Sequence, residues 1–120
     1  MFVKKFMNEY TKYLNKIVKV IIDRPLGSKH PIHDLVYSLN YGYVPNTSAP
    51  DKEEIDAYIL GVSEPLTDFT GECIAIIHRL DDDDDKLVIA PKGETYTNEQ
   101  IKSLTDFQEK YFKSKIVRVK

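Results

Sequence analysis

Short runs of strand-forming residues, each closed by a turn, are the feature of this chain that most limits its fold. The run from Ile17 to Ile22 is rich in β-branched residues, and the segment R-P-L-G-S at 24–28 stops it. Further runs of apolar, β-branched or aromatic residues are Tyr37 to Val44, Asp56 to Leu60, Cys73 to Leu80, Lys86 to Ala90 and Lys115 to Val119. Such residues fit a pleated, half-buried backbone, so we expect about five or six short strands.

A helix is expected at each end of the chain. Large apolar residues recur at helical spacing between residues 2 and 14, namely Phe2, Phe6, Met7, Tyr10 and Leu14. Such an amphipathic helix can pack on the molecule's own sheet or lie on a membrane surface, and packing is the commoner outcome. Thr97 and Gln100 form a capping box that opens a second helix, from about Asn98 to Phe112.

Short strands between two helices predict an α+β fold that is mainly β. We expect a small OB-like barrel of about five or six strands, closed or nearly closed, with an N-terminal and a C-terminal helix. The chain has 120 residues and shows neither an internal repeat nor a linker. Residues 1–120 are therefore expected to form a single domain with one core.

The bulk composition excludes several classes of protein. Hydrophobic residues make up 42% and charged residues 30%, as in ordinary globular proteins. A net charge of −2 argues against a nucleic-acid partner, and no apolar run is long enough to span a membrane. The only cysteine, Cys73, cannot form an internal disulfide, so we expect a buried thiol and a reducing, cytoplasmic compartment. The oligomeric state, a homo-oligomer included, is left open.

Two acidic clusters carry the chemistry of the chain. The first, within A-P-D-K-E-E-I-D, comprises Asp51, Glu53, Glu54 and Asp56, and the second is the run from Asp81 to Asp85. Hard carboxylate oxygens on loops between rigid strands are the ligands that Mg²⁺ or Mn²⁺ requires. Phenols and lysines nearby suit a phosphate ligand, so the pattern predicts a metal-dependent phosphoryl-transfer site. A solvated acidic turn at each cluster is the alternative.

Strand periodicity indicates which acids converge. If a strand begins near Asp56, then Asp56 and Tyr58 share one face, while Ile55 points to the other. Within the second cluster, a hairpin tip can present alternate carboxylates inward. We expect Asp81 and Asp84 to matter, and the other three aspartates of the run to face water.

A zinc site is not expected. His30 and His33 are three residues apart, but Pro31 between them forbids a regular helix that carries both. No cysteine lies near enough to complete a structural zinc site.

The chain resembles the soluble, family I-type inorganic pyrophosphatases, of which it would be a short variant. The segment N-Y-G-Y-V-P-N-T followed by A-P-D-K-E-E-I-D is similar to that family's tyrosine-rich strand and its D-G-D-x-x-D motif. The segment D-D-D-D-D-K-L-V-I-A-P is similar to the family's second acidic loop. The resemblance covers Val18 to Tyr111, and it implies an inorganic-pyrophosphatase-like barrel that hydrolyses pyrophosphate with Mg²⁺ or Mn²⁺.

The resemblance also implies roles for single residues. The carboxylates that would hold the divalent cations are Asp51, Asp56, Asp81 and Asp84, with Asp56 as the bridge. Glu53 would orient and deprotonate the attacking water, which becomes a metal-bound hydroxide, and Tyr41 would lie beside it. The side chains that would contact the phosphates are Lys86, Tyr111, Arg24 and Tyr37, and Asp23 falls at a further matching position.

Four departures from the family pattern bear on activity. Lys52 replaces the glycine of D-G-D, Glu53 replaces its second aspartate, and Phe112 replaces the lysine after the phosphate-binding tyrosine. An N-terminal hairpin that supplies charged residues is mostly missing, and the candidates to replace its cations are Arg24, Lys29 and Arg79. These departures keep open a hydrolase of another phosphate ester or nucleotide, and a non-catalytic phosphate- or metal-binding relative.

Overall fold

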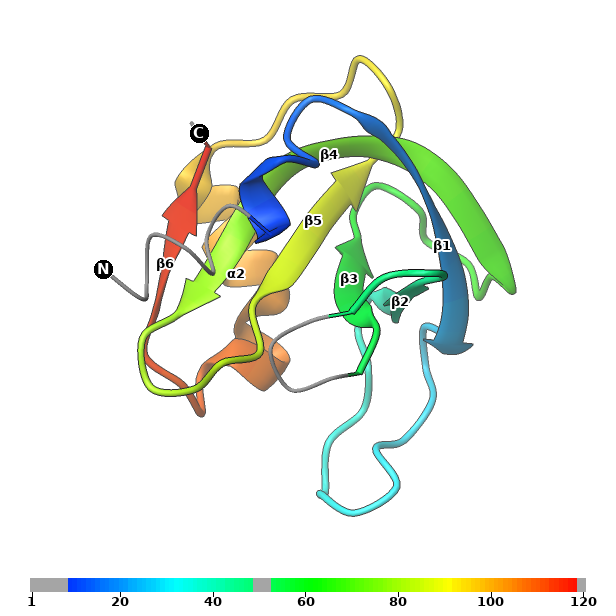
Figure 1. Ribbon diagram of the computed structural model, residues 1–120. Coiled ribbons are helices and arrows are strands. Elements are labelled where there is room, and N and C mark those ends of the chain that lie inside the picture. The colour runs from blue at the N-terminus through cyan, green and yellow to red at the C-terminus, as the bar shows by residue number, and fades with distance from the viewer. Residues whose placement is uncertain (1–8, 49–52, 119–120) are drawn as a thin grey trace.

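The computed structural model describes residues 9–48 and 53–118. It contains the strands β1 (Ile17–Arg24), β2 (Asn40–Val44), β3 (Ile55–Ile59), β4 (Asp68–Arg79), β5 (Lys86–Ala90) and β6 (Ser114–Val117). Helix α2 (Asn98–Glu109) lies between β5 and β6 in the chain, and residues 9–11 are helical (Figure 1).

Five strands close into a barrel. Their order is β1-β2-β3-β5-β4, and β4 pairs again with β1, while β6 extends the sheet beyond β4 (Figure 1). The 12-residue strand β4 makes this closure possible, because its first residues pair with β1 and its later ones with β5 and β6. The expected barrel is therefore confirmed, with six strands in its sheet.

β2, β3, β5 and the second half of β4 are buried on both faces, whereas β1 alternates between buried and exposed residues. One core cluster draws apolar residues from all five barrel strands, among them Val20, Val44, Ala57, Cys73 and Leu87, and it fills the barrel. A second cluster lies on the opposite face and joins the strands to α2 through Ile101. Strands that are covered on both sides read as continuous apolar runs, as β5 does.

A bulge in β4 decides which of its side chains face α2. The register with β5 shifts between Cys73 and Ala75, so that Cys73 and Ile76 both join the cluster inside the barrel. Ala75 and Ile77 lie in the second cluster, and Arg79 follows them two residues later. The bulge thus directs the end of β4 toward the face where α2 packs.

One parallel pairing brings Asp56 of the first acidic cluster beside the second cluster. β3 and β5 run parallel, and Asp56 is the register partner of Lys86. Parallel neighbours begin at the same edge of a sheet, so the loops that precede both strands meet there. These loops carry the first and the second acidic cluster.

The close approach of β1 to β2 requires Gly42 of the N-Y-G-Y segment. A Cβ built on Gly42 would overlap the carbonyl oxygen of Ile21, which precedes Ile22, the partner of Gly42 across the strand pair. Any side chain there would push the two strands apart. This glycine therefore serves the fold of the barrel.

Most element predictions are confirmed, with shifted ends. β5 and the start of α2 lie where expected, and the capping box of Thr97 and Gln100 is present. β4 begins at Asp68, earlier than predicted, and the last strand is Ser114–Val117. Residues 37–39 precede β2 and are not a strand. Most of the expected N-terminal helix lies outside the described residues.

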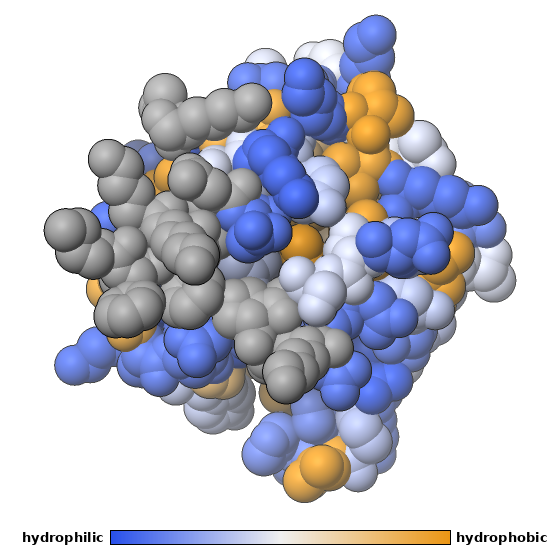
Figure 2. All heavy atoms as spheres, viewed as in Figure 1, coloured by the Kyte–Doolittle hydropathy of each residue, from blue (hydrophilic) through white to orange (hydrophobic). Residues whose placement is uncertain are grey.

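The coloured part of the face shown in Figure 2 is largely polar. Hydrophilic residues dominate the face seen in Figure 2, where apolar atoms form small patches, one at the tip of the loop from β1 to β2. That loop carries Ile32, which is 83% exposed. No helix of the described residues combines the length and apolar character needed to cross a lipid bilayer.

Candidate active site

A cleft of about 660 Å³ lies on the outer face of the barrel, beside the end of α2. Its lining combines acidic, basic, uncharged polar and apolar side chains. The acids are Asp23, Asp34, Asp56 and Asp84, and the basic residues are Arg24, His30, His33, Arg79 and Lys86. Tyrosines Tyr37, Tyr41 and Tyr111 complete the polar wall with Gln108, and Leu35 and Phe112 are its apolar members.

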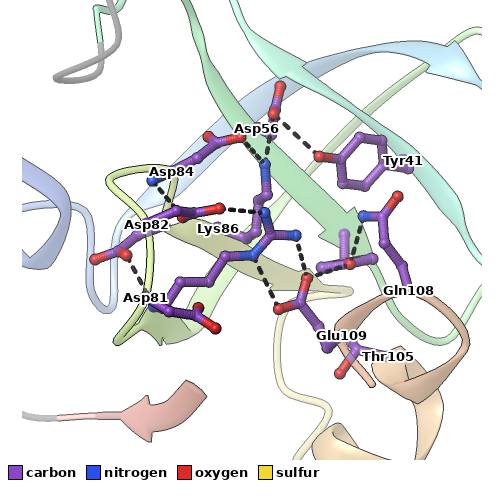
Figure 3. Close-up of polar contacts among 12 residues, drawn as sticks. Tyr41, Asp56, Asp81, Asp82, Asp84, Lys86, Thr105, Gln108 and Glu109 are labelled. Carbon is purple, nitrogen blue, oxygen red and sulfur yellow. Dashed lines mark hydrogen bonds and ion pairs between the residues drawn. The ribbon is translucent and has the colours of Figure 1, made fainter. Parts of the chain in front are cut away.

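The ammonium group of Lys86 lies between two carboxylates. Its Nζ donates to Asp56 Oδ2 at 2.7 Å and to Asp84 Oδ2 at 2.6 Å (Figure 3). The hydroxyl of Tyr41 donates to the same oxygen of Asp56 at 3.0 Å. Lys86 is only 2% exposed, so water contributes little to stabilising its ammonium group. The carboxylates of Asp56 and Asp84 take over that role.

Strand geometry explains this arrangement. Asp56 of β3 and Lys86 of β5 are register partners, and Tyr41 of β2 pairs with Tyr58, two residues along β3 from Asp56. Tyr41 and Tyr58 belong to the cluster facing α2, and Asp56 shares their side of β3, as its spacing from Tyr58 predicted. The three polar groups therefore project into the cleft from a rigid sheet.

A second ion pair lies deeper in the same cleft. The guanidinium of Arg79 donates through Nε and Nη2 to the two oxygens of Glu109, at 3.1 and 2.7 Å. Its Nη1 donates to Asp82 Oδ2 at 3.2 Å, and the other oxygen of Asp82 accepts from the backbone N–H of Asp84 at 2.8 Å. Asp82 thus couples Arg79 to the loop that carries Asp84.

A chain of hydrogen bonds connects this ion pair to the cleft wall. Tyr37 donates to Gln108 Oε1 at 2.9 Å, and Gln108 Nε2 donates to the hydroxyl of Tyr58 at 2.7 Å. Tyr58 in turn donates to Glu109 Oε2 at 2.6 Å. Each group in this series donates to the next, so the positions of the Tyr37 hydroxyl and the Glu109 carboxylate are linked through Gln108 and Tyr58.

The second acidic cluster is not a solvated loop. Asp85 is buried, and it accepts from the backbone N–H of Arg79 at 2.9 Å and contacts His78 Nδ1 at 2.8 Å. Our expectation that Asp82, Asp83 and Asp85 face water is therefore wrong for Asp85 and Asp82. Asp83 is exposed, and only its carbonyl has a described bond, from Tyr10.

Electrostatics at the mouth of the cleft reflect excess negative charge. Burial raises the pKa of Tyr41 well above its usual value, and the nearby charge of Asp56 raises it further, so this phenol stays protonated. Burial also raises the pKa of Asp23, to which Asp56 and Glu54 contribute by repulsion while Arg24 opposes them. A cation bound here would relieve that repulsion.

The structure gathers most of the predicted site residues. Those that line the cleft are Arg24, Tyr37, Tyr41, Asp56, Asp84, Lys86 and Tyr111. Asp81 is exposed outside the cleft lining and accepts from the backbone N–H of Lys113 at 3.1 Å. Glu53 is exposed just before β3, and Asp51 and Lys52 lie outside the described residues.

Sequence reasoning missed Gln108, which lines the cleft, and Glu109, which lies outside its lining and pairs with Arg79. Gln108 and Glu109 are polar, so they resemble solvated helix positions, yet both are buried. They follow Ile101 and Thr105 at helical spacing on the buried side of α2, and this spacing is the signal that identifies them. His30 lines the cleft too, with its Nδ1 accepting from the backbone N–H groups of Ile32 and His33.

The donor chemistry of the site fits a hard divalent cation. Its candidate ligands are carboxylates, and Lys86 already places a positive charge between Asp56 and Asp84. Within residues 9–48 and 53–118, no three acidic, histidine or cysteine side chains converge as a ready-made ligand group. Asp56 and Asp84 would hold the cation, and completion of its shell by Asp51 stays a prediction.

The family model for inorganic pyrophosphatase matches residues 4–117 of the chain, almost its whole length. The chain belongs to the inorganic pyrophosphatase family. This family assignment confirms the expectation of an inorganic diphosphatase with a general dependence on divalent metal. No protein of curated function matches the chain.

Solved inorganic pyrophosphatases share the fold of this chain. The protein from Ehrlichia chaffeensis superposes with a TM-score of 0.69 at 16% identity, covering 88% of each chain. That from Coxiella burnetii has a TM-score of 0.62 at 17% identity, covering 83% of each. That from Helicobacter pylori has a TM-score of 0.60 at 16% identity, covering 90% of this chain and 86% of its own. At such low identity these similarities establish the barrel.

Proposed function

We propose that this chain hydrolyses inorganic pyrophosphate to two phosphates and requires a divalent cation, Mg²⁺ or Mn²⁺. The observation that supports it best is the placement of Lys86 between Asp56 and Asp84, in a cleft of a chain from the pyrophosphatase family. Carboxylates for a cation and fixed donors for phosphate oxygens lie within one cleft. This combination is what phosphoryl transfer to water requires.

The chain's own residues would bind and orient the reactants. When bound, the divalent cation supplies Lewis-acid activation of water and neutralisation of phosphate charge. Asp56 and Asp84 would hold it. Tyr41, kept protonated by burial, fixes one oxygen of Asp56 through its hydrogen bond. Glu53 would accept the proton of the attacking water.

The phosphate groups would meet the basic and phenolic wall. Lys86 has three N–H donors and uses two of them on Asp56 and Asp84. Its third donor can reach a phosphate oxygen. Arg24, Tyr37 and Tyr111 line the same cleft and would neutralise or bind the remaining phosphoryl oxygens.

Phosphate release assays test the proposal. Protein stripped with EDTA should be inactive on pyrophosphate, and added Mg²⁺ should restore activity, with Mn²⁺ measured in parallel. A nucleoside triphosphate and a simple phosphate monoester should be hydrolysed far more slowly. Faster hydrolysis of either one would favour another phosphohydrolase, and release of no phosphate from any of them would indicate a binding protein.

The cellular setting that we propose is the cytoplasm. Cys73 is buried and unpaired, as expected of a protein made in a reducing compartment. Fractionation of the source cells would contradict this if the protein were recovered outside the cytoplasmic fraction.

A further inference from the structure

The guanidinium of Arg79 is a cation built into the floor of the cleft. Arg79 is the last residue of β4, and it is 5% exposed while still lining the cleft beside Asp84 and Lys86. Of the three cations proposed to replace the missing hairpin, Arg24 and Arg79 line this cleft. Lys29 is exposed outside the lining.

Arg79 is fixed on three sides. Glu109 takes two of its N–H groups, Asp82 takes a third, and the ring of Phe112 packs 3.6 Å from its central carbon. The two acids come from different elements, Glu109 from α2 and Asp82 from the loop before β5 (Figure 3). The guanidinium of an arginine stays protonated in proteins, so the charge of Arg79 persists. An arginine fixed in this way loses little entropy when a ligand binds.

Two donors of Arg79 remain available for a ligand. A guanidinium carries five N–H groups, of which two are on each terminal nitrogen. The described bonds use Nε, one N–H of Nη1 and one N–H of Nη2. Among the described residues, one N–H is therefore left on each terminal nitrogen. Such a pair matches two oxygens of one phosphate group.

The contact between Phe112 and Arg79 indicates that residue 79, and not residue 112, supplies the positive charge in this part of the cleft. The resemblance expects a lysine after Tyr111, but this chain has Phe112 there. The phenyl ring of Phe112 carries no charge, but it packs against the guanidinium of Arg79, which supplies a positive charge to this part of the cleft. The cation that is absent at 112 is present at 79, in contact with the residue that replaced it.

We propose that Arg79 binds a phosphate group of the substrate through its two remaining N–H donors, with Phe112 and Glu109 as positioning residues. This inference rests on the proposed function, because it assigns one more substrate contact to the same cleft. A purely structural role is the alternative. A buried ion pair is weak evidence for stability, however, since apolar residues of similar volume often serve a core as well. The location at the cleft floor therefore favours binding.

Two variants test the inference. Arg79→Lys keeps the charge and removes the fork of donors. Arg79→Met combined with Glu109→Gln removes both charges, so that no buried carboxylate is left unpaired. Arg118→Lys is the control, because Arg118 lies outside the cleft lining and bonds to Tyr96 and Asn98. Circular dichroism and thermal melting establish that each variant is folded.

The probe is inorganic phosphate, titrated calorimetrically in the presence of Mg²⁺. We expect affinity to fall at least about tenfold in both Arg79 variants and to be unchanged in the control. The KM for pyrophosphate should rise in the same two variants. Affinity within about twofold of the parent protein in both folded variants would overturn the inference.

Two further measurements keep the inference separate from folding and from the proposed function. In the unaltered protein, the NMR signal of the Arg79 guanidinium should shift on phosphate titration, and an unchanged signal would also overturn the inference. If the unaltered protein fails to hydrolyse pyrophosphate, the proposed function is wrong, yet the phosphate titrations still decide the role of Arg79.

Discussion

At the scale of single residues, Asp56 is the predicted ligand that joins Lys86 to Tyr41. One of its oxygens accepts from both Lys86 and Tyr41. It also contributes to the raised pKa of Asp23 by repulsion. A change at Asp56 should therefore alter cation binding, the placement of Lys86 and the charge of the cleft at once.

Asp56→Asn should weaken Mg²⁺ affinity and turnover together. Loss of an outer partner of a metal ligand typically costs about 10–100-fold in affinity, and loss of a ligand itself should cost no less. Calorimetric Mg²⁺ titration and phosphate release measure the two effects. Asp83→Asn is the matched control in the exposed part of the acidic run. Equal behaviour of the two variants would show that the acids act only as a diffuse negative surface.

Two substitutions test the role of Glu53, one expected to lower turnover and the other to retain or raise it. Glu53→Gln keeps the length of the side chain but cannot take a proton, so turnover should fall by about 10²–10⁴-fold with Mg²⁺ affinity retained. Glu53→Asp restores the acid of the family motif and should retain or raise activity. Steady-state kinetics separate kcat from KM. Normal turnover of the Gln variant would remove Glu53 from the mechanism.

At the scale of elements, the hairpin from β4 to β5 combines structural and functional aspartates in one run. Asp85 faces His78 and the backbone of Arg79, whereas Asp84 faces Lys86. The structural aspartate thus holds the loop in the conformation that presents the functional one.

Asp85→Ala should destabilise the fold by about 1–3 kcal/mol, because it leaves the buried N–H of Arg79 without its acceptor. Urea unfolding measures the change. Asp83→Ala is the control and should stay within about 0.5 kcal/mol. An Asp85 variant as stable as this control would mean that water replaces the lost carboxylate.

Helices and strands could be predicted from sequence wherever a single local pattern, such as an apolar run or a capping box, marked them clearly. β5 has an unbroken apolar run and α2 has a complete capping box, so both could be located from local sequence. The first part of β4 was missed because it alternates with polar residues and is held by its pairing with β1, which is remote in sequence. Residues 37–39 have strand propensity, but the backbone of Tyr37 bonds to Gly27 and Ser28 instead.

Site residues were predictable from sequence where the residue type itself indicates a role, as a carboxylate indicates metal binding. Carboxylates in motifs identified Asp56 and Asp84, and the phenolic strand identified Tyr41. The role of Asp85 could not be read, because adjacent aspartates differ only in which partner the fold gives them. Arg79 could be named only as a candidate cation, because its pairing with Glu109 depends on a contact between β4 and α2 that no local pattern encodes.

At the scale of the whole molecule, closure of the barrel protects its interior. Cys73 lies in β4 within the barrel core and is fully buried, and burial raises the pKa of its thiol to about 12. Its reactive thiolate is therefore scarce in the folded state near neutral pH.

Native protein should react with a thiol reagent only as fast as it opens. The labelling rate should become independent of reagent concentration, and it should rise little between about pH 7 and pH 9, because opening of the barrel, and not deprotonation of the thiol, then limits the rate. Protein in urea, with an ordinary thiol pKa, should react rapidly and serves as control. Rapid labelling of the native protein, proportional to reagent, would contradict a closed barrel around Cys73.

The parallel pairing of β3 with β5 has a consequence for the order of folding. Asp56 and Lys86 are paired although the whole of β4 lies between them in the chain, so the cleft depends on contacts between distant segments. We expect such contacts to form late in folding, because the entropy of closing the intervening chain must be offset first. A cation that binds between these segments should hardly change the folding rate and should mainly slow unfolding. Stopped-flow measurements should therefore show Mg²⁺ lowering the unfolding limb alone, which would make cation supply a determinant of how long each folded molecule survives.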